Sequence, residues 1–292
     1  MMRFTPLLIA LFIAACAEPA SGEDAPEIAQ TGGLCPEGRA AIEAEDADAA
    51  ADAYEACLNA RRYDWRDEVQ LRAQLGSARL VAGDDEAALM SFNQAIGVMA
   101  DNGGDPDSPV LRRNRAAALM SLGRYEEALE DIDVALARAG RPDAFTQLLR
   151  GSALLETGKP AEAVEAFDAA IRIEPDYIGA WSGRSAAFID LGMTARAVED
   201  GREAVSIAPE DASALNTLCW ALVNDERASE GLAICDQAVE ADPDSGPIVH
   251  SRAAALEQVG RIDEARRLYA RAYELAPEDE EIAEDYARSR DF

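Results

Sequence analysis

Basic side chains are scarce in this sequence. Its 292 residues include 27 Lys and Arg against 56 Asp and Glu, which gives a formal charge of 27 − 56 = −29 at pH 7. A protein that follows a nucleic-acid backbone needs a basic face to displace counterions, so this balance argues against nucleic acid as a partner. Anionic lipid headgroups are disfavoured for the same reason. We expect partner proteins with basic segments, whose binding weakens as salt screens the acidic surface.

Histidine is almost absent, since His250 is the only one in the chain. A zinc site built on two helical histidines is therefore impossible, and the cysteines lack the short spacing of metal ligands. We predict no catalytic residues, no metal and no small-molecule cofactor. An envelope enzyme that uses paired carboxylates is the alternative, although this many acids on helices is more typical of solvated faces.

Long apolar runs are missing too. The longest candidate, Leu7 to Ala15, has nine residues, whereas a membrane-spanning helix needs about 20. This run follows the cation Arg3, an order typical of a secretory signal. We therefore predict a signal peptide over residues 1–15 and no transmembrane helix.

The residue after this run is Cys16, preceded by Ile-Ala-Ala, and these four residues resemble a bacterial lipobox. The resemblance implies a lipid-modified Cys16 on a lipoprotein of the bacterial envelope that faces the periplasm, at the outer rather than the inner membrane. Residues 16–34 contain little to bury and predict a flexible tether. Ordinary cleavage near Ala17 or Ala20, which would give a soluble secreted module, is the alternative.

Four cysteines remain besides Cys16, an even number in a compartment where disulfides persist. We predict the bridges Cys35–Cys57 and Cys219–Cys235, each of which closes a short loop and contributes about 3 kcal/mol in the chain-entropy account. Four buried thiols are the alternative, because free cysteine often acts as a small core residue.

An internal repeat runs through most of the chain. Pro175, Pro209, Pro243 and Pro277 follow one another at steps of 34 residues. If each proline is place 32 of a 34-residue unit, place 27 is alanine in every unit and place 8 is always small. Place 15 is glycine in five of six units, where it can end one helix and turn the chain. The pattern predicts pairs of closely packed helices and leaves no room for strands.

This pattern resembles the tetratricopeptide repeat, and aromatics at Phe92, Phe167, Trp181 and Tyr269 add to the likeness. The resemblance implies an all-α solenoid, a right-handed superhelix of helix-turn-helix repeats. We predict six units at 69–102, 109–143, 144–177, 178–211, 212–245 and 246–279. A divergent helical pair at 35–68 and a capping helix at 280–292 would close the two ends.

The place numbers also predict contacts within a repeat. Cys219 at place 8 and Cys235 at place 24 lie on helices that pack together, which makes theirs the stronger of the two disulfide predictions. Arg115 and Arg184 at place 7 each have an aspartate sixteen residues later. We expect an ion pair between the two helices of each of these repeats.

The resemblance further implies a concave groove, lined by the first helix of each repeat, in which partner peptides lie. Trp220 is the most informative residue of this stripe, with packing against a neighbouring repeat as the alternative. His250 is a candidate donor or pH-sensitive contact, with an uninvolved surface histidine as the alternative. The predicted groove residues are Arg113, Phe145, Leu148, Ser152, Glu156, Ile189, Asp190, Asn216, Trp220, Asn224, His250 and Gln258.

The function that these features predict is binding of other proteins or peptides. The chain would act as a lipid-anchored periplasmic scaffold or adaptor in envelope assembly or regulation, held to the membrane by its lipid alone.

Overall fold

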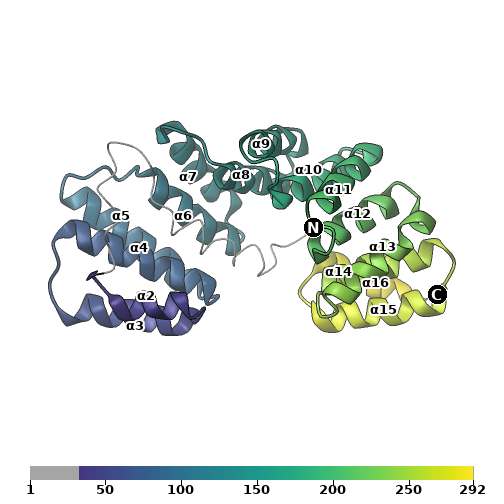
Figure 1. The fold of residues 1–292 in the computed structure, drawn as a ribbon, viewed down its shortest axis with the longest axis horizontal. Helices are drawn as coiled ribbons and strands as arrows, with labels where there is room; N and C mark the ends of the chain where they lie inside the picture. Colours follow the sequence, from purple (N-terminus) through teal and green to yellow (C-terminus); the bar gives the residue numbers. More distant parts are fainter. Residues whose placement is uncertain (1–32, 292) are drawn as a thin grey trace. The chain divides into compact units, whose positions relative to one another are not determined.

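The computed structural model describes residues 33–291, which form fifteen α-helices and no strand (Figure 1). The all-α prediction is confirmed. The predicted signal peptide, the lipid site at Cys16 and nearly all of the tether lie outside the described residues. None of the described helices is both long enough and apolar enough to cross a bilayer.

The chain divides into two compact units, with the boundary between Leu149 and Arg150 inside α8 (Ala144–Glu156). The N-terminal unit contains α2 (Pro36–Glu43), α3 (Ala47–Ala60), α4 (Trp65–Val81), α5 (Asp85–Asp101), α6 (Pro109–Ser121) and α7 (Tyr125–Arg138). The C-terminal unit contains α9 (Pro160–Ile173), α10 (Ile178–Asp190), α11 (Thr194–Ile207), α12 (Ala212–Asn224), α13 (Ala228–Ala241), α14 (Gly246–Gln258), α15 (Ile262–Leu275) and α16 (Glu280–Ser289).

The first helices of five repeats begin at the residues where the 34-residue period starts, and α16 begins at Glu280. The first repeat differs, because α4 begins at Trp65 and not at Val69. The carboxylate of Asp64 accepts hydrogen bonds from the backbone amides of Arg66 and Asp67 and so starts the helix early. The divergent pair accordingly ends with α3 at Ala60, several residues before the predicted boundary at 68.

In two of the repeats, α4/α5 and α8/α9, the two helices pack through a glycine at place 8 and a phenylalanine ring at place 24. A Cβ atom added to Gly151 would lie 2.6 Å from the Phe167 ring. Gly38 approaches Tyr54 with the same separation of sixteen residues. The α2/α3 pair is therefore built like the regular repeats, and a side chain at either glycine would push its two helices apart.

Candidate protein-binding surface

Three of the predicted groove residues belong to the N-terminal unit. The Arg113 guanidinium lies 3.7 Å from an Asp143 carboxylate oxygen and 5.7 Å from the centre of the Phe145 ring. Leu148 is only 2% exposed. Leu148 is thus a core residue and not a groove contact, because an apolar helix face is buried against its neighbours.

The four predicted residues on α8 and α10 differ widely in exposure. Ser152 is buried at 8% exposure, Glu156 and Ile189 are half-buried, and Asp190 is exposed. Ile189 packs against the core cluster that contains Phe188. Ser152 and Ile189 therefore support the fold, which leaves Asp190 as the accessible polar group at the end of α10.

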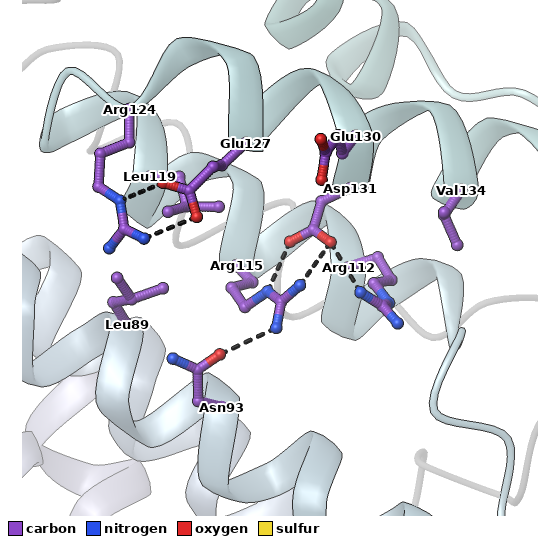
Figure 2. A pocket seen from close by; sticks show the side chains of 10 residues that line it. All are labelled: Leu89, Asn93, Arg112, Arg115, Leu119, Arg124, Glu127, Glu130, Asp131 and Val134. Carbon is purple, nitrogen blue, oxygen red and sulfur yellow. Dashed lines mark hydrogen bonds and ion pairs between the residues drawn. The ribbon is translucent and has the colours of Figure 1, made fainter.

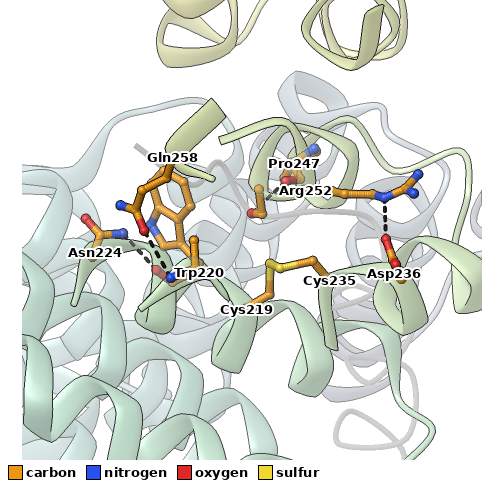
Figure 3. The surroundings of a disulfide bond; sticks show 10 residues. Cys219, Trp220, Asn224, Cys235, Asp236, Pro247, Arg252 and Gln258 are labelled. Carbon is orange, nitrogen blue, oxygen red and sulfur yellow. Dashed lines mark hydrogen bonds and ion pairs between the residues drawn. A yellow bond between two sulfur atoms is a disulfide. The ribbon is translucent and has the colours of Figure 1, made fainter. Parts of the chain in front are cut away.

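Of the predicted residues on α12 and α14, Trp220, Asn224 and Gln258 lie close together in the C-terminal unit (Figure 3). Trp220 is half-buried, and its indole centre lies 5.5 Å from the His250 ring. The Asn224 amide donates to the backbone oxygen of Trp220 at 2.9 Å. Gln258 bridges the repeats, since it donates to the Val223 oxygen and accepts from the Ala228 amide. Gln258 thus joins α14 to the end of α12 and to the start of α13, beside the indole.

His250 is not a surface histidine, because it is only 4% exposed. Its Nε2 lies 2.9 Å from an Asp285 carboxylate oxygen of α16, and its ring centre lies 5.6 Å from that of Tyr269. The alternative of an uninvolved surface residue is therefore wrong. The C-terminal helix covers this histidine and fixes its ring.

Four charged or polar groups around His250 join the last repeat to α16. Arg288 Nη2 donates to Glu257 at 2.9 Å and to Asp285 at 3.1 Å, and Tyr269 Oη donates to Glu257 at 2.7 Å. The hydrogen bonds from Arg288, and then the one from Tyr269, lower the pKa of Glu257. Burial disfavours ionisation of Asp285, but bonds from His250 and Arg288 outweigh it and lower this pKa as well.

Both pairs of cysteine sulfurs lie at bonding distance, 2.19 Å for Cys35 and Cys57 and 2.15 Å for Cys219 and Cys235. Cys219 and Cys235 are fully buried, and Cys219 directly precedes Trp220 (Figure 3). Glu37 lies near Cys35 and Cys57, and these three form the one group of potential metal-ligating side chains within the described residues. Oxidation of both pairs in the cell remains a prediction.

The place-7 arginines make the ion pairs that the sequence predicts. Arg115 binds Asp131 through Nε at 2.6 Å, and Arg184 binds Asp200 through Nε at 2.8 Å. Asp200 is almost fully buried, and burial raises its pKa even though Arg184 opposes this. The pKa of Arg184 is raised in turn, because Asp200 and Asp168 accept its hydrogen bonds.

The place-7 arginines, which include Arg252, also bind the residue at place 25 of the preceding repeat. This contact was not predicted from the sequence. Arg115 donates to Asn93, Arg184 to Asp168 and Arg252 to Asp236. The signal was present in the sequence, because place 25 holds an acid or amide before each of these arginines. Before α12, which has Leu218 at place 7, place 25 is Arg202 instead.

A pocket surrounds the Arg115 ion pair between α5 and α7 (Figure 2). Arg112 also binds Asp131, at 2.9 Å, and Arg124 binds Glu127 at 2.7 Å. The three guanidinium groups that line this pocket are thus each paired with a carboxylate of the repeat array. Their arrangement explains how these helices hold together.

Two family models, both described as "Tetratricopeptide repeat", match residues 113–178 and 180–288. The chain belongs to the tetratricopeptide repeat family. Proteins of this family are protein-interaction scaffolds.

Curated relatives share only part of their length with this tetratricopeptide repeat protein. Small glutamine-rich tetratricopeptide repeat-containing protein 2 of Mycosarcoma maydis is 32% identical over 111 residues, which is 36% of this chain and 28% of the relative. Protein STIP1 homolog of Dictyostelium discoideum is 33% identical over 101 residues, 34% of this chain and 16% of the relative. The likeness therefore extends to the repeats and not to the whole relatives.

Solved structures confirm the fold. A tetratricopeptide repeat protein from Parabacteroides merdae aligns with a TM-score of 0.70 at 16% identity, over 88% of this chain and 97% of that one. A thermophilic tetratricopeptide repeat protein of Thermus thermophilus aligns with a TM-score of 0.57 at 22% identity, over 63% of this chain and all of the other.

Proposed function

We propose that this chain is a scaffold or adaptor of the bacterial envelope that binds a segment of another protein on the surface formed by α12, α14 and α16. The observation that carries the proposal is the half-buried Trp220 between Asn224 and His250. An indole that a partner can cover completely contributes strongly to binding, while the fixed side chains around it keep the surface preformed.

The proposed location rests on the N-terminal sequence. A lipid on Cys16 would keep the protein at the periplasmic face of the membrane, with residues 16–34 as a tether. The two cysteine pairs suit that oxidising compartment. Metabolic labelling with radioactive fatty acid tests the anchor directly, because the label should enter the wild type and not Cys16→Ala. Equal labelling of both proteins would contradict it.

The binding function is tested by affinity capture from membrane extract with wild type and Trp220→Ala. We expect a set of partners that wild type retains and Trp220→Ala loses, and whose retention falls as salt rises. Trp181→Ala is the matched control, because the Trp181 indole donates to the backbone oxygen of Pro175 at the end of the preceding repeat. Circular dichroism must show that both variants remain helical, and equal capture by all three proteins would refute the assignment of the surface.

A further inference from the structure

The two disulfides differ in how close they lie to solvent. Cys219 and Cys235 are both 0% exposed. In the other pair, Cys35 is 3% exposed and Cys57 is half-buried. The exposed side chain of Glu37 places a carboxylate oxygen within 4.8 Å of both sulfurs of this second pair. The bond between Cys35 and Cys57 therefore lies near the surface, where a thiol from another molecule can approach it.

The surroundings of the two sulfurs indicate which one is attacked and which one leaves. Cys57 is the more exposed of the two, so an attacking thiolate reaches its sulfur first. Cys35 directly precedes α2, and the free amides at the start of a helix stabilise a thiolate, which makes that sulfur the better leaving group. Once it carries a proton, the Cys35 thiol can donate to the backbone oxygen of Ala53, which lies 3.3 Å from the sulfur.

The same bond fastens a short helix to the rest of the N-terminal unit. α2 has eight residues, and only Gly38 among them is buried, against the Tyr54 ring of α3. On the other side of the bond, Tyr63 Oη donates to the backbone oxygen of Cys57 at 3.0 Å and so holds the end of α3 independently. Cleavage of the bond should therefore loosen α2 and leave α3 in place.

We propose that the Cys35–Cys57 bond is a site of thiol–disulfide exchange whose substrate is a dithiol flanked by positive charge. The first substrate thiol loses its proton to water and bonds to the Cys57 sulfur, while the electron pair of the broken bond passes to the Cys35 sulfur, which takes a proton from water. The second thiol displaces Cys57 in the same way, so the dithiol is oxidised to a disulfide and both cysteines are reduced to thiols. The Glu37 carboxylate attracts a cationic substrate and repels an anionic one.

Limited reduction of the full-length chain by dithiothreitol tests which bond is open to exchange. Free thiols are alkylated at successive times and located by peptide mass spectrometry. Cys35 and Cys57 should be labelled at least about tenfold faster than Cys219 and Cys235, because the buried bond reacts only after local opening of α12/α13. Equal rates, the reverse order, or labelling of Cys35 and Cys57 before any reductant is added would overturn the proposal.

Two monothiols, cationic cysteamine and anionic mercaptoethanesulfonate, test the direction of attack and the preference for charge. Rapid alkylation of the released thiol should trap cysteamine on Cys57 and the alkyl group on Cys35. The ratio of the cysteamine rate to the sulfonate rate should fall about threefold in Glu37→Gln. It should not change in Glu43→Gln, which removes an equal charge from α2 at a carboxylate that pairs with Arg39. Cysteamine on Cys35, or the same ratio in all three proteins, would overturn the proposal.

Discussion

The two helical pairs that contain a cysteine pair, α2/α3 and α12/α13, differ from the others at the turn between their helices. Glu45 and Glu226 occupy these turns with φ of 57° and 56°. The corresponding turns of the other five pairs contain glycine, with φ between 69° and 83°. Glycine adopts this left-handed conformation freely, whereas a residue with a Cβ atom is strained there.

The same helical pair is therefore held in two ways: with a disulfide and a strained glutamate turn, or with an unstrained glycine turn and no disulfide. A glutamate at the turn costs about 1 kcal/mol, and a disulfide that closes a loop of this length contributes about 3 kcal/mol. The cross-linked pairs therefore tolerate a poor turn. In α12/α13 the disulfide also replaces the glycine and aromatic contact, because Cys219 and Cys235 occupy the positions that Gly151 and Phe167 hold two repeats earlier.

The largest effect is expected in a pair without a cross-link. Arg184→Ala in α10 would leave the buried Asp200 carboxylate without its cation and should lower the free energy of unfolding by about 3–5 kcal/mol. Denaturant unfolding followed by circular dichroism measures this loss. The double variant Arg184→Met/Asp200→Leu is the control and should recover most of it, because no unpaired charge remains. A loss below about 1 kcal/mol in Arg184→Ala would contradict the role given to this pair.

Removal of the covalent link should have the next largest effect. Cys219→Ala/Cys235→Ala should destabilise the C-terminal unit by about 3 kcal/mol, since the unfolded chain regains the entropy of an open loop. Reductant should destabilise wild type and should act on the double variant only through Cys35–Cys57. Alkylation of both Cys219 and Cys235 in the non-reduced protein would show that the bond does not form.

The smallest effect concerns the turns themselves. Glu226→Gly should stabilise the protein by about 1 kcal/mol or less, because glycine relieves the left-handed strain but gains entropy in the unfolded chain. The reverse change Gly192→Glu, in a pair without a disulfide, should destabilise by a similar amount. Thermal unfolding compares the two variants, and a loss of stability in Glu226→Gly would mean that the glutamate side chain has a stabilising contact.

The helical pairs could be predicted from the sequence because their spacing is local. Ala at place 27, a small residue at place 8 and glycine at place 15 fix where helices touch and turn within one repeat. The ion pairs of Arg115 and Arg184 with acids sixteen residues later follow from the same local spacing. Helix starts depend on individual capping groups, so the early start of α4 at Trp65 was missed.

The candidate site was harder to predict because its contacts join different repeats. The sequence places His250 on the inner stripe, but its burial depends on Asp285, which lies 35 residues further on. Leu148 and Ser152 fall on the same stripe and are nevertheless buried. Periodicity gives the face of a helix on which a side chain lies, whereas the depth of that face depends on the packing of the next helix.

The arginines at place 7 have a further consequence for how such a chain can evolve. Arg184 and Arg252 donate hydrogen bonds to acids of their own repeat or of the preceding repeat. Within the described C-terminal unit, neither guanidinium bonds to a more distant repeat. A duplicated block of 34 residues would contain its own place-7 arginine, which binds the preceding repeat, and the acid that binds the arginine of the following repeat. Gene-level gain or loss of whole blocks can therefore lengthen or shorten the array without new compensating substitutions.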